Sequence, residues 1–455
     1  MIKEKLFGTD GIRQKVGLYP LDDTSVYKLG RVIGELISVS GTRIGIGRDT
    51  RSSGEHLAKL IASGILHTSP HTEIYDLGHI PTPGLSFATD HSPLEFGIMI
   101  TASHNPYTDN GIKIFGSDGE KLSQELEDEI ERLFHSQEDS LLEQSSSIVF
   151  APGSDGLKEL YVRFLKGHAS GIDGKINGTP IKIVLDCAEG ATYQIAPLIF
   201  KEAGFDPVVI HAHPDGENIN LGCGSTNTDR VREIVLTEKA HLGISFDGDG
   251  DRVILVDKLG RTLDGDHTIY FISKYLNATR EDFNKTVVGT IMGNLGLEKA
   301  LGDMGIRYLR AKVGDKYVYR EMKDNQSIIG GEQSGHTILK CFQRSGDGIM
   351  TALYFIKSLD YLGIDPGEAF NHLVLFPQVS RDIRIREKKD LAHWDSLNSQ
   401  IHEFNEKHGN NSRLVIRYSG TEPKIRLMIE SEDRTVIEKN IGLFEQMIRS
   451  TIGVD

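Results

Sequence analysis

The sequence predicts an α/β protein built from several domains. Short apolar runs of strand length alternate with longer amphipathic stretches, which is the pattern of strands buried beneath helices. Several of these runs end directly in polar loops, as strands do at the ligand-binding edge of an α/β sheet. The chain has 455 residues, about three times the usual single-domain length of roughly 150, so several hydrophobic cores are expected.

Four apolar runs are predicted to be strands that lead into polar loops, at residues 42–47, 96–101, 181–186 and 242–247. A further strand is expected from Val253. Apolar residues at helical spacing predict helices over Ser123 to Phe134 and over Thr435 to Ile448. The helices carry no evident chemistry, so the loops that follow the strands are the places to look for a site.

Changes in composition predict three domain boundaries. The polar stretch from Ser136 to Ser154 is rich in Ser, Gln and Glu and suits a linker. A second break is expected after Arg252, and a third near Phe376, beyond which the mixture is typical of an α+β domain. The predicted segments are 1–150, 151–252, 253–374 and 375–455, and the first three can share one α/β plan.

Charge and composition exclude several classes of partner. The 51 Lys and Arg stand against 65 Asp and Glu, a net charge of -14, which argues against nucleic acid and anionic membranes as partners. There is no signal-peptide stretch at the start and no apolar run of about 18 residues, so a cytoplasmic protein is expected. Three cysteines, Cys187, Cys223 and Cys341, without CxxC spacing fit idle thiols in a reducing compartment.

The loop Thr101-Ala-Ser-His-Asn-Pro106 follows a predicted strand. A hydroxyl at a strand end, flanked by His104 and Asn105 and followed by Pro106, is placed as a nucleophile or phosphate carrier. The alternative is an ordinary turn in which the side chain bonds to the backbone. The candidate nucleophile is Ser103.

The loop Asp247-Gly-Asp-Gly-Asp-Arg252 follows another predicted strand. Its three carboxylates, Asp247, Asp249 and Asp251, suit a hard cation such as Mg²⁺, and uncompensated carboxylates this close would repel one another. A calcium EF-hand is excluded because Arg252 replaces the required Gly and Lys258 the required Glu.

Two further loops suit a phosphorylated sugar. In Gly330-Gly-Glu-Gln-Ser-Gly-His336, the side chains of Glu332, Ser334 and His336 can bond to a polyol, although a plain Gly-rich turn explains the pattern equally well. In Arg417-Tyr-Ser-Gly-Thr-Glu-Pro-Lys-Ile-Arg426, hydroxyls, backbone amides and two guanidinium groups suit an anion, against the alternative of a solvated hairpin. The chain has no Walker loop, dinucleotide fingerprint or His-Glu-x-x-His, which disfavours kinases and NAD enzymes.

Taken together and in order, the motifs resemble those of the α-D-phosphohexomutase family. They are Phe7-Gly-Thr-Asp-Gly-Ile-Arg13, Gly47-Arg-Asp-Thr-Arg51, Thr101 to Pro106, Asp247 to Arg252, Gly331 to His336 and Arg417 to Pro423. The resemblance implies four domains around a central cleft, three similar α/β domains and a C-terminal α+β domain that binds phosphate.

The resemblance also implies roles for residues. Ser103 would be a phosphoserine, and Mg²⁺ would be held by Ser103 with Asp247, Asp249 and Asp251. Arg13 and Arg252 would neutralise phosphate charge, and His104 and Lys113 would transfer protons. The sugar would contact Glu332, Ser334 and His336, and the phosphate that does not react would be held by Arg417, Ser419, Gly420, Thr421 and Arg426. A sugar bisphosphate would be the intermediate and activator.

Two features are similar to the phosphoglucosamine mutase branch of that family. They are Gln333 and the segment Asp215-Gly-Glu-Asn-Ile-Asn220 followed by Cys223-Gly-Ser-Thr226. This similarity implies conversion of glucosamine 6-phosphate to glucosamine 1-phosphate, on the way to UDP-N-acetylglucosamine and cell-wall precursors, by a monomer or homodimer. Tyr418, Lys316 and Gln14 depart from the family's usual Pro, Arg and Gly.

Three other functions stay open. The first is a phosphomannomutase or phosphoglucomutase of the same family. The second is a phosphatase similar to the haloacid dehalogenases, with Asp247 as nucleophile, although Asp251 stands where such enzymes usually carry Thr or Val. The third is a sugar-phosphate sensor without activity.

Overall fold

The structure is a computed structural model that describes residues 5–37, 42–137, 148–409, 411–419 and 423–454. Within these residues there are thirteen α-helices and five β-sheets, and the α/β class predicted from the sequence is confirmed. The chain divides into two compact units, Met1–Thr290 with Leu309–Phe370 and Ile291–Tyr308 with Asn371–Asp455. Among the described residues no helix is long and apolar enough to cross a membrane.

The first sheet has the strand order β1-β5-β4-β2-β3. Strand β2 is parallel to β3 and β4, whereas β5 runs antiparallel to β4 and β1. Its strands are β1 (Ile12–Lys15), β2 (Arg43–Arg48), β3 (Glu73–His79), β4 (Phe96–Ile100) and β5 (Asp109–Gly116). The helices of this segment are α1 (Asp23–Leu36), α2 (Gly54–Thr68), α3 (Thr82–Asp90) and α4 (Gln124–Ser136). A core of Ile, Leu and Val side chains joins α1, α2 and α4 to the sheet.

The second sheet repeats this plan with the order β12-β11-β10-β8-β9. Strand β8 is parallel to β9 and β10, and β11 runs antiparallel to β10 and β12. Its strands are β8 (Ile183–Asp186), β9 (Val208–Ile210), β10 (Leu242–Phe246), β11 (Val253–Asp257) and β12 (Thr262–Leu263). The helices are α5 (Ser154–Ala169), α6 (Ile195–Glu202) and α7 (Asp229–Thr237), and a small hairpin joins β6 (Lys175–Ile176) and β7 (Thr179–Pro180).

The third sheet has the order β14-β13-β15-β16, with β13 parallel to β15 and β15 antiparallel to β16. Its strands are β13 (Thr286–Thr290), β14 (Arg307–Ala311), β15 (Ile329–Gly331) and β16 (Thr337–Leu339). The accompanying helices are α8 (Gly265–Thr279), α10 (Asp315–Asp324) and α11 (Gly348–Leu362).

One connection recurs in all three sheets. It runs from a parallel strand to the antiparallel strand beside it, through residues 101–108 after β4, 247–252 after β10 and 332–336 after β15. These are the serine, carboxylate and sugar-loop motifs of the sequence. The chemistry therefore lies on three equivalent loops.

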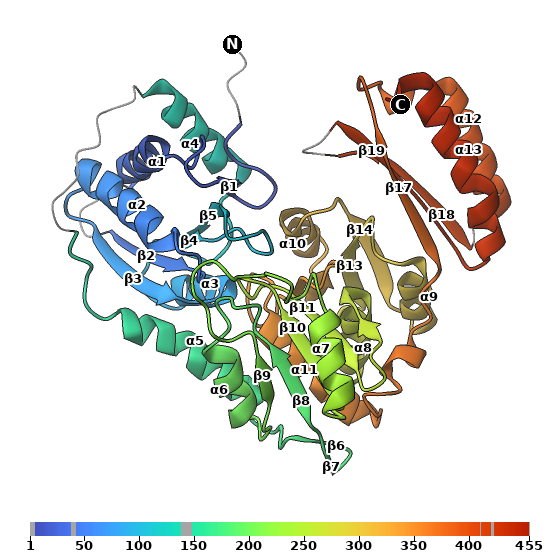
Figure 1. Cartoon of the computed structure of the whole chain (residues 1–455), viewed down its shortest axis with the longest axis horizontal. Helices are drawn as coiled ribbons and strands as arrows, with labels where there is room; N and C mark the ends of the chain where they lie inside the picture. The colour runs from blue at the N-terminus through green and yellow to red at the C-terminus, as the bar shows by residue number, and fades with distance from the viewer. Residues whose placement is uncertain (1–4, 38–41, 138–147, 410, 420–422, 455) are drawn as a thin grey trace. The chain divides into compact units, whose positions relative to one another are not determined.

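The second unit contains a three-stranded antiparallel sheet, β17-β19-β18. Helices α12 and α13 lie side by side along one face of this sheet (Figure 1), over a core that includes Trp394, Phe404 and Phe444. The elements are β17 (Gln378–Arg384), β18 (Ser412–Tyr418), β19 (Lys424–Ser431), α9 (Leu295–Asp303), α12 (Asp395–His408) and α13 (Arg434–Ile452). Short 3₁₀ helices cover Ala369–His372 and Leu391–His393.

The predicted elements are present with small shifts at their ends. The helix predicted over Ser123 to Phe134 is α4, and Ser123 caps it by accepting a hydrogen bond from the Leu126 amide at 3.3 Å. The strand predicted at 181–186 begins at Ile183. Residues 138–147 of the predicted linker lie outside the described part of the chain, and the boundaries at 150, 252 and 374 stay predictions.

Candidate active site

Ser103 lies in the loop after β4, with its side chain fully buried. Its Oγ donates to Asp247 Oδ2 at 2.7 Å and lies 3.3 Å from His104 Nδ1. The backbone of Ser103 has a φ of 51°, a left-handed conformation that is rare for residues other than Gly, Asn and Asp. The Thr101 hydroxyl accepts a hydrogen bond from the backbone amide of Ser103 at 2.9 Å. This local turn directs the serine side chain toward the carboxylate loop.

Asp247, Asp249 and Asp251 are buried in the loop after β10, and they offer oxygens that all lie within 4.8 Å of one another. The turn between them depends on Gly250, whose φ is +73°. Asp249 Oδ1 and Asp251 Oδ1 are buried and have no hydrogen-bond partner among the described residues. Burial, together with Asp251 and Asp249, raises the pKa of Asp247 well above its ordinary value. Unsatisfied carboxylate oxygens at this spacing fit a hard divalent cation.

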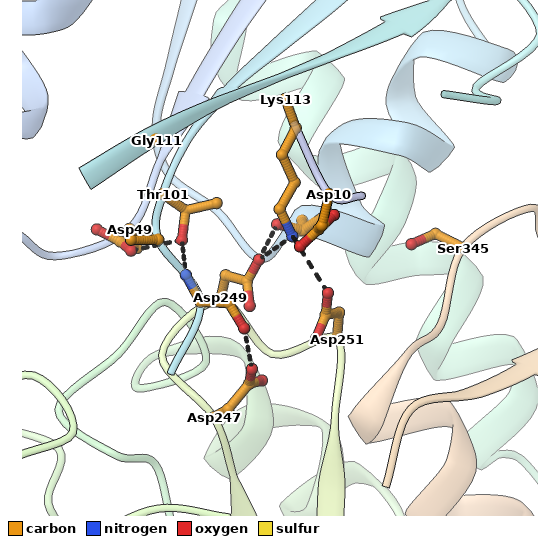
Figure 2. Close-up of polar contacts among 12 residues, drawn as sticks. Asp10, Asp49, Thr101, Gly111, Lys113, Asp247, Asp249, Asp251 and Ser345 are labelled. Carbon is orange, nitrogen blue, oxygen red and sulfur yellow. Dashed lines mark hydrogen bonds and ion pairs between the residues drawn. The ribbon is translucent and has the colours of Figure 1, made fainter. Parts of the chain in front are cut away.

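The side chain of Lys113, on β5, points toward Asp249, Asp251 and Asp10 (Figure 2). Its Nζ donates to Asp249 Oδ2 at 2.9 Å and to Asp251 Oδ2 at 3.3 Å, and lies 3.1 Å from Asp10 Oδ2. Burial disfavours the ammonium, but Asp10, Asp249 and Asp251 outweigh it and raise the pKa of Lys113 well above its ordinary value. Lys113 is therefore a fixed cation at neutral pH.

Asp10 belongs to the Phe7 to Arg13 motif but is not among the site residues predicted from the sequence. Its carboxylate pairs with Arg13 and Lys121 as well as with Lys113. Burial opposes its charge, but Lys113, Lys121 and Arg13 hold the pKa of Asp10 well below the usual range. Lys121 also pairs with Asp315, which begins α10. The charged network of the site thus extends from the first two sheets to the start of α10.

Arg252 and Arg13 supply further positive charge. The Arg252 amide donates to Asp247 Oδ1 at 3.2 Å, and its Nε lies 3.7 Å from Asp251 Oδ1. Both arginines carry a buried Nε without a hydrogen-bond partner in the part of the chain that the structure describes. Burial, together with Arg252 and Arg13, lowers the pKa of His104 to about 4, so its imidazole is neutral at pH 7. These groups suit an anion beside a neutral proton acceptor.

The sugar-loop residues lie in the same unit. Residues 252 and 336 form an antiparallel bridge, which joins this loop to the carboxylate loop. His336 is buried, with Nδ1 3.6 Å from Asp251 Oδ1 and Nε2 3.8 Å from Asp315 Oδ2. Glu332 is half-buried and accepts the Gly314 amide at 3.1 Å, while Ser334 is exposed.

The predicted phosphate loop lies in the second unit. Arg417 and Arg426 face each other on β18 and β19, where two like charges repel. Burial and Arg426 lower the pKa of Arg417, whose buried Nε has no partner among the described residues. Ser419 is buried, and Gly420 and Thr421 lie outside the described residues. Two facing guanidinium groups suit a bound anion.

The three departures from the family pattern have structural partners. The Tyr418 hydroxyl accepts the Lys389 amide at 2.8 Å and donates to the Lys389 carbonyl, which ties this strand end down in place of Pro. Lys316 donates to Glu127 Oε2 at 2.6 Å. Gln14 is exposed and donates to the Tyr19 carbonyl at 3.2 Å.

A second group of possible metal ligands comprises Asp186, His211 and Cys223. Asp186 already accepts hydrogen bonds from His211 Nδ1, Ser245 Oγ and the Ala188 and Gly224 amides, at 2.9 to 3.0 Å. Burial raises the pKa of Cys223 to about 12. A saturated carboxylate beside a protonated thiol is a structural anchor.

Sequence models of one family match the chain in four consecutive parts. Phosphoglucomutase/phosphomannomutase α/β/α domains I, II and III match residues 4–140, 159–260 and 264–375, and the C-terminal domain of the same family matches 382–440. Each of the three α/β matches contains one of the three equivalent loops.

Individual proteins are also similar over nearly their whole length. A Deinococcus deserti protein named phosphoglucosamine mutase is 39% identical over 96% of this chain and 97% of its own. A Marinomonas phosphoglucosamine mutase is 39% identical over 98% of both chains. The crystal structure of a phosphoglucomutase/phosphomannomutase family protein from Burkholderia thailandensis superposes with a TM-score of 0.79 at 21% identity, covering 100% of both chains.

Proposed function

Because the chain belongs to the phosphoglucomutase/phosphomannomutase family, we propose that it interconverts glucosamine 6-phosphate and glucosamine 1-phosphate through a phosphorylated Ser103. Family membership makes it a phosphohexomutase, an isomerase that moves a phosphoryl group between two positions of a hexose. The observation that carries the proposal for Ser103 is its buried Oγ, 2.7 Å from Asp247 in a group of three carboxylates. The choice of glucosamine rests on the names of the relatives.

Mg²⁺ fits Asp247, Asp249, Asp251 and the phosphorylated Ser103, where it would neutralise the charge of the transferring group. Arg13 and Arg252 add positive charge at the same place, and Lys113 compensates the carboxylates. This preorganised charge is the main contribution that a protein makes to phosphoryl transfer.

The chain's residues account for both halves of the reaction. Ser103 gives up its phosphoryl group as the Oγ–P bond breaks and a P–O bond forms to the free sugar hydroxyl. The hydroxyl proton passes to His104, whose neutral imidazole lies 3.3 Å from Ser103 Oγ, and His104 hands a proton to the Ser103 oxygen as that oxygen leaves phosphorus. The resulting bisphosphate turns over, and the Ser103 hydroxyl attacks its other phosphoryl group, so that a new Oγ–P bond forms as the P–O bond to the sugar breaks. His104 takes the Ser103 hydroxyl proton and delivers it to the newly freed sugar oxygen. Lys113, held protonated, is better suited to charge compensation than to accepting a proton.

The proposal also covers the residues that bind the sugar and its second phosphate, the use of the product and the location of the protein. Glu332, Ser334 and His336 are proposed to contact the sugar, and Arg417, Ser419, Gly420, Thr421 and Arg426 the phosphate that does not react. The product would supply UDP-N-acetylglucosamine and peptidoglycan precursors. We infer a cytoplasmic monomer or homodimer whose partners are small hexosamine phosphates.

Turnover of three sugar phosphates tests the proposal. With Mg²⁺ and a catalytic amount of glucose 1,6-bisphosphate, the protein is expected to convert glucosamine 6-phosphate faster than glucose or mannose 6-phosphate, and Ser103→Ala to convert none. Faster turnover of glucose or mannose 6-phosphate would instead identify the protein as a phosphoglucomutase or phosphomannomutase of the same family. Release of inorganic phosphate without an isomerised product would favour the phosphatase that uses Asp247.

A further inference from the structure

The segment 211–224 contacts the serine loop, although the two are more than a hundred residues apart in sequence. The Asn220 side-chain amide donates to the carbonyl of Ser103 at 2.8 Å and to the carbonyl of Asn105 at 3.1 Å. The backbone of Asn220 has a φ of 58°, and its backbone N–H donates a hydrogen bond to the carbonyl of Ala188 at 2.9 Å. Asn tolerates this conformation better than most residues, so the position combines a backbone requirement with a donor.

Arg51 donates hydrogen bonds to the same two carbonyl oxygens. Its Nη2 donates to the Ser103 carbonyl at 3.0 Å and to the Asn105 carbonyl at 2.9 Å, while its Nη1 donates to the Asp109 carbonyl at 3.0 Å. The Arg51 side chain is fully buried and pairs with Asp49, which in turn accepts the Thr101 hydroxyl at 2.6 Å. Each carbonyl therefore accepts two hydrogen bonds, one from the buried Arg51 in the loop after β2 and one from the half-buried Asn220 in the segment between β9 and α7.

This contact is tight on the carboxylate side as well. A Cβ at Gly248, between Asp247 and Asp249, would lie 2.6 Å from the Ser103 carbonyl and 2.7 Å from Asn220 Nδ2. Only glycine leaves room there. The serine loop, the carboxylate loop and Asn220 are thus in close contact at Gly248.

The segment that carries Asn220 is held at both ends. The Asp186 carboxylate accepts a hydrogen bond from His211 Nδ1 at the start of the segment and one from the Gly224 amide at its end, both at 2.9 Å. Asp186 ends β8, next to β10, which leads into the carboxylate loop. Asn220 is therefore fixed to the sheet that presents the carboxylates.

We propose that Asn220, together with Arg51, is a positioning residue that holds Ser103 in the left-handed conformation from which its Oγ reaches Asp247. The segment Asp215–Asn220 then serves the serine loop, not recognition of the sugar. This inference rests on the proposed role of Ser103. It assigns a task to two motifs, Gly47 to Arg51 and Asp215 to Asn220, that the reaction scheme leaves unexplained.

The test uses two substitutions that keep the left-handed backbone accessible. Asn220→Asp preserves shape but turns an oxygen toward the two carbonyls, and Asn220→Gly preserves backbone freedom while removing the side chain. The matched control is Asn227→Asp, because Asn227 is exposed and only its side-chain oxygen contacts the Asp229 amide. Thermal unfolding verifies that each variant is folded, and Arg51→Lys provides a further probe if one is not.

The readout is the rate at which Ser103 becomes phosphorylated by glucose 1,6-bisphosphate, followed by intact-mass spectrometry. Both Asn220 variants are expected to lower this rate about tenfold or more with little change in half-saturating concentration, because misplacement of a reacting group slows the step and not binding. Asn227→Asp should match the wild type, and the ratio of glucosamine to glucose turnover should stay constant.

Wild-type rates in both Asn220 variants would overturn the inference. So would a changed glucosamine-to-glucose ratio at an unchanged phosphorylation rate, because the segment would then recognise the sugar. If Ser103 of the wild type is phosphorylated but glucosamine 6-phosphate is not isomerised, the proposed substrate is wrong. The role of Asn220 is then judged from the rate of Ser103 phosphorylation alone. If Ser103 is never phosphorylated, both are wrong.

Discussion

Lys113 is a buried ammonium that contacts three carboxylates, Asp10, Asp249 and Asp251. Replacing Lys113 by Met leaves these charges uncompensated, at a cost of about 3–5 kcal/mol in the free energy of unfolding. Mg²⁺ should restore part of this loss, because it can take over the role of the cation. Thermal unfolding with and without Mg²⁺ checks this.

The control for Lys113→Met is Lys59→Met, which removes only an exposed pair with Glu55. The control variant is expected to unfold like the wild type. If Lys113→Met does so too, or if Mg²⁺ raises its Tm no more than that of the wild type, Lys113 does not compensate the cation site.

Arg417 and Arg426 face each other on β18 and β19, and Arg426 Nε lies 3.8 Å from Asp382 Oδ1 on β17. If they hold a phosphate, Arg417→Gln removes charge-assisted hydrogen bonds of about 1.5–3 kcal/mol, roughly tenfold or more in KM for the sugar phosphate. The rate of Ser103 phosphorylation at saturating bisphosphate should change less. Steady-state kinetics measures both, and an unchanged KM would remove Arg417 from the binding site.

At the residue scale, the sequence predicts groups whose chemistry is local. Ser103 and the three aspartates follow strands in short motifs, so the pattern alone marks them. Asp10, Arg51 and Asn220 act on partners that are distant in sequence, such as Lys113 or the Ser103 carbonyl. Their motifs were visible, but only the packing of the sheets assigns them a contact.

Helices α5 and α11 meet at a contact between His168 and Tyr354. His168 Nδ1 lies 3.0 Å from the Tyr354 hydroxyl, and burial together with Lys357 lowers the pKa of His168 to about 4. Between pH 6.5 and 4, His168 is more protonated in the unfolded chain than in the folded chain. The contribution of His168 to stability is therefore present above pH 6.5 and lost as pH falls toward 4.

His168→Phe is expected to reduce the loss of stability on acidification by about 1–2 kcal/mol, allowing for the partial exposure of the ring. Urea unfolding at pH 7 and pH 4.5 measures the difference. His402→Gln, which alters an exposed histidine paired with Glu406, is the control. Parallel pH dependence in wild type and His168→Phe would contradict the low pKa.

At the scale of elements, the predicted strands and helices are present, but their equivalence could not be predicted. Only strand pairing shows that the loops after β4, β10 and β15 occupy the same position in three sheets. The sequence has no short-period repeat that would reveal it. Three loops of equivalent origin explain how the serine, the carboxylates and His336 come together in one unit.

For the whole molecule, the net charge of -14 is compatible with binding of a small anion because positive charge is local. Arg13, Lys113, Lys121 and Arg252 gather around the serine and carboxylate loops. The length predicts several domains, and the net charge argues against nucleic acid and anionic membranes as partners. Length and charge could not predict that the chain divides into two compact units, because that division depends on long-range packing.

The location of the phosphate on the enzyme tests the central claim most directly. After incubation with labelled glucose 1,6-bisphosphate, the label is mapped by peptide analysis and treated with hydroxylamine, which cleaves acyl phosphates and spares phosphoserine. The account predicts a hydroxylamine-resistant label on the peptide that contains Ser103, which is then discharged by glucosamine 6-phosphate. A hydroxylamine-sensitive label on the peptide that contains Asp247 would contradict it.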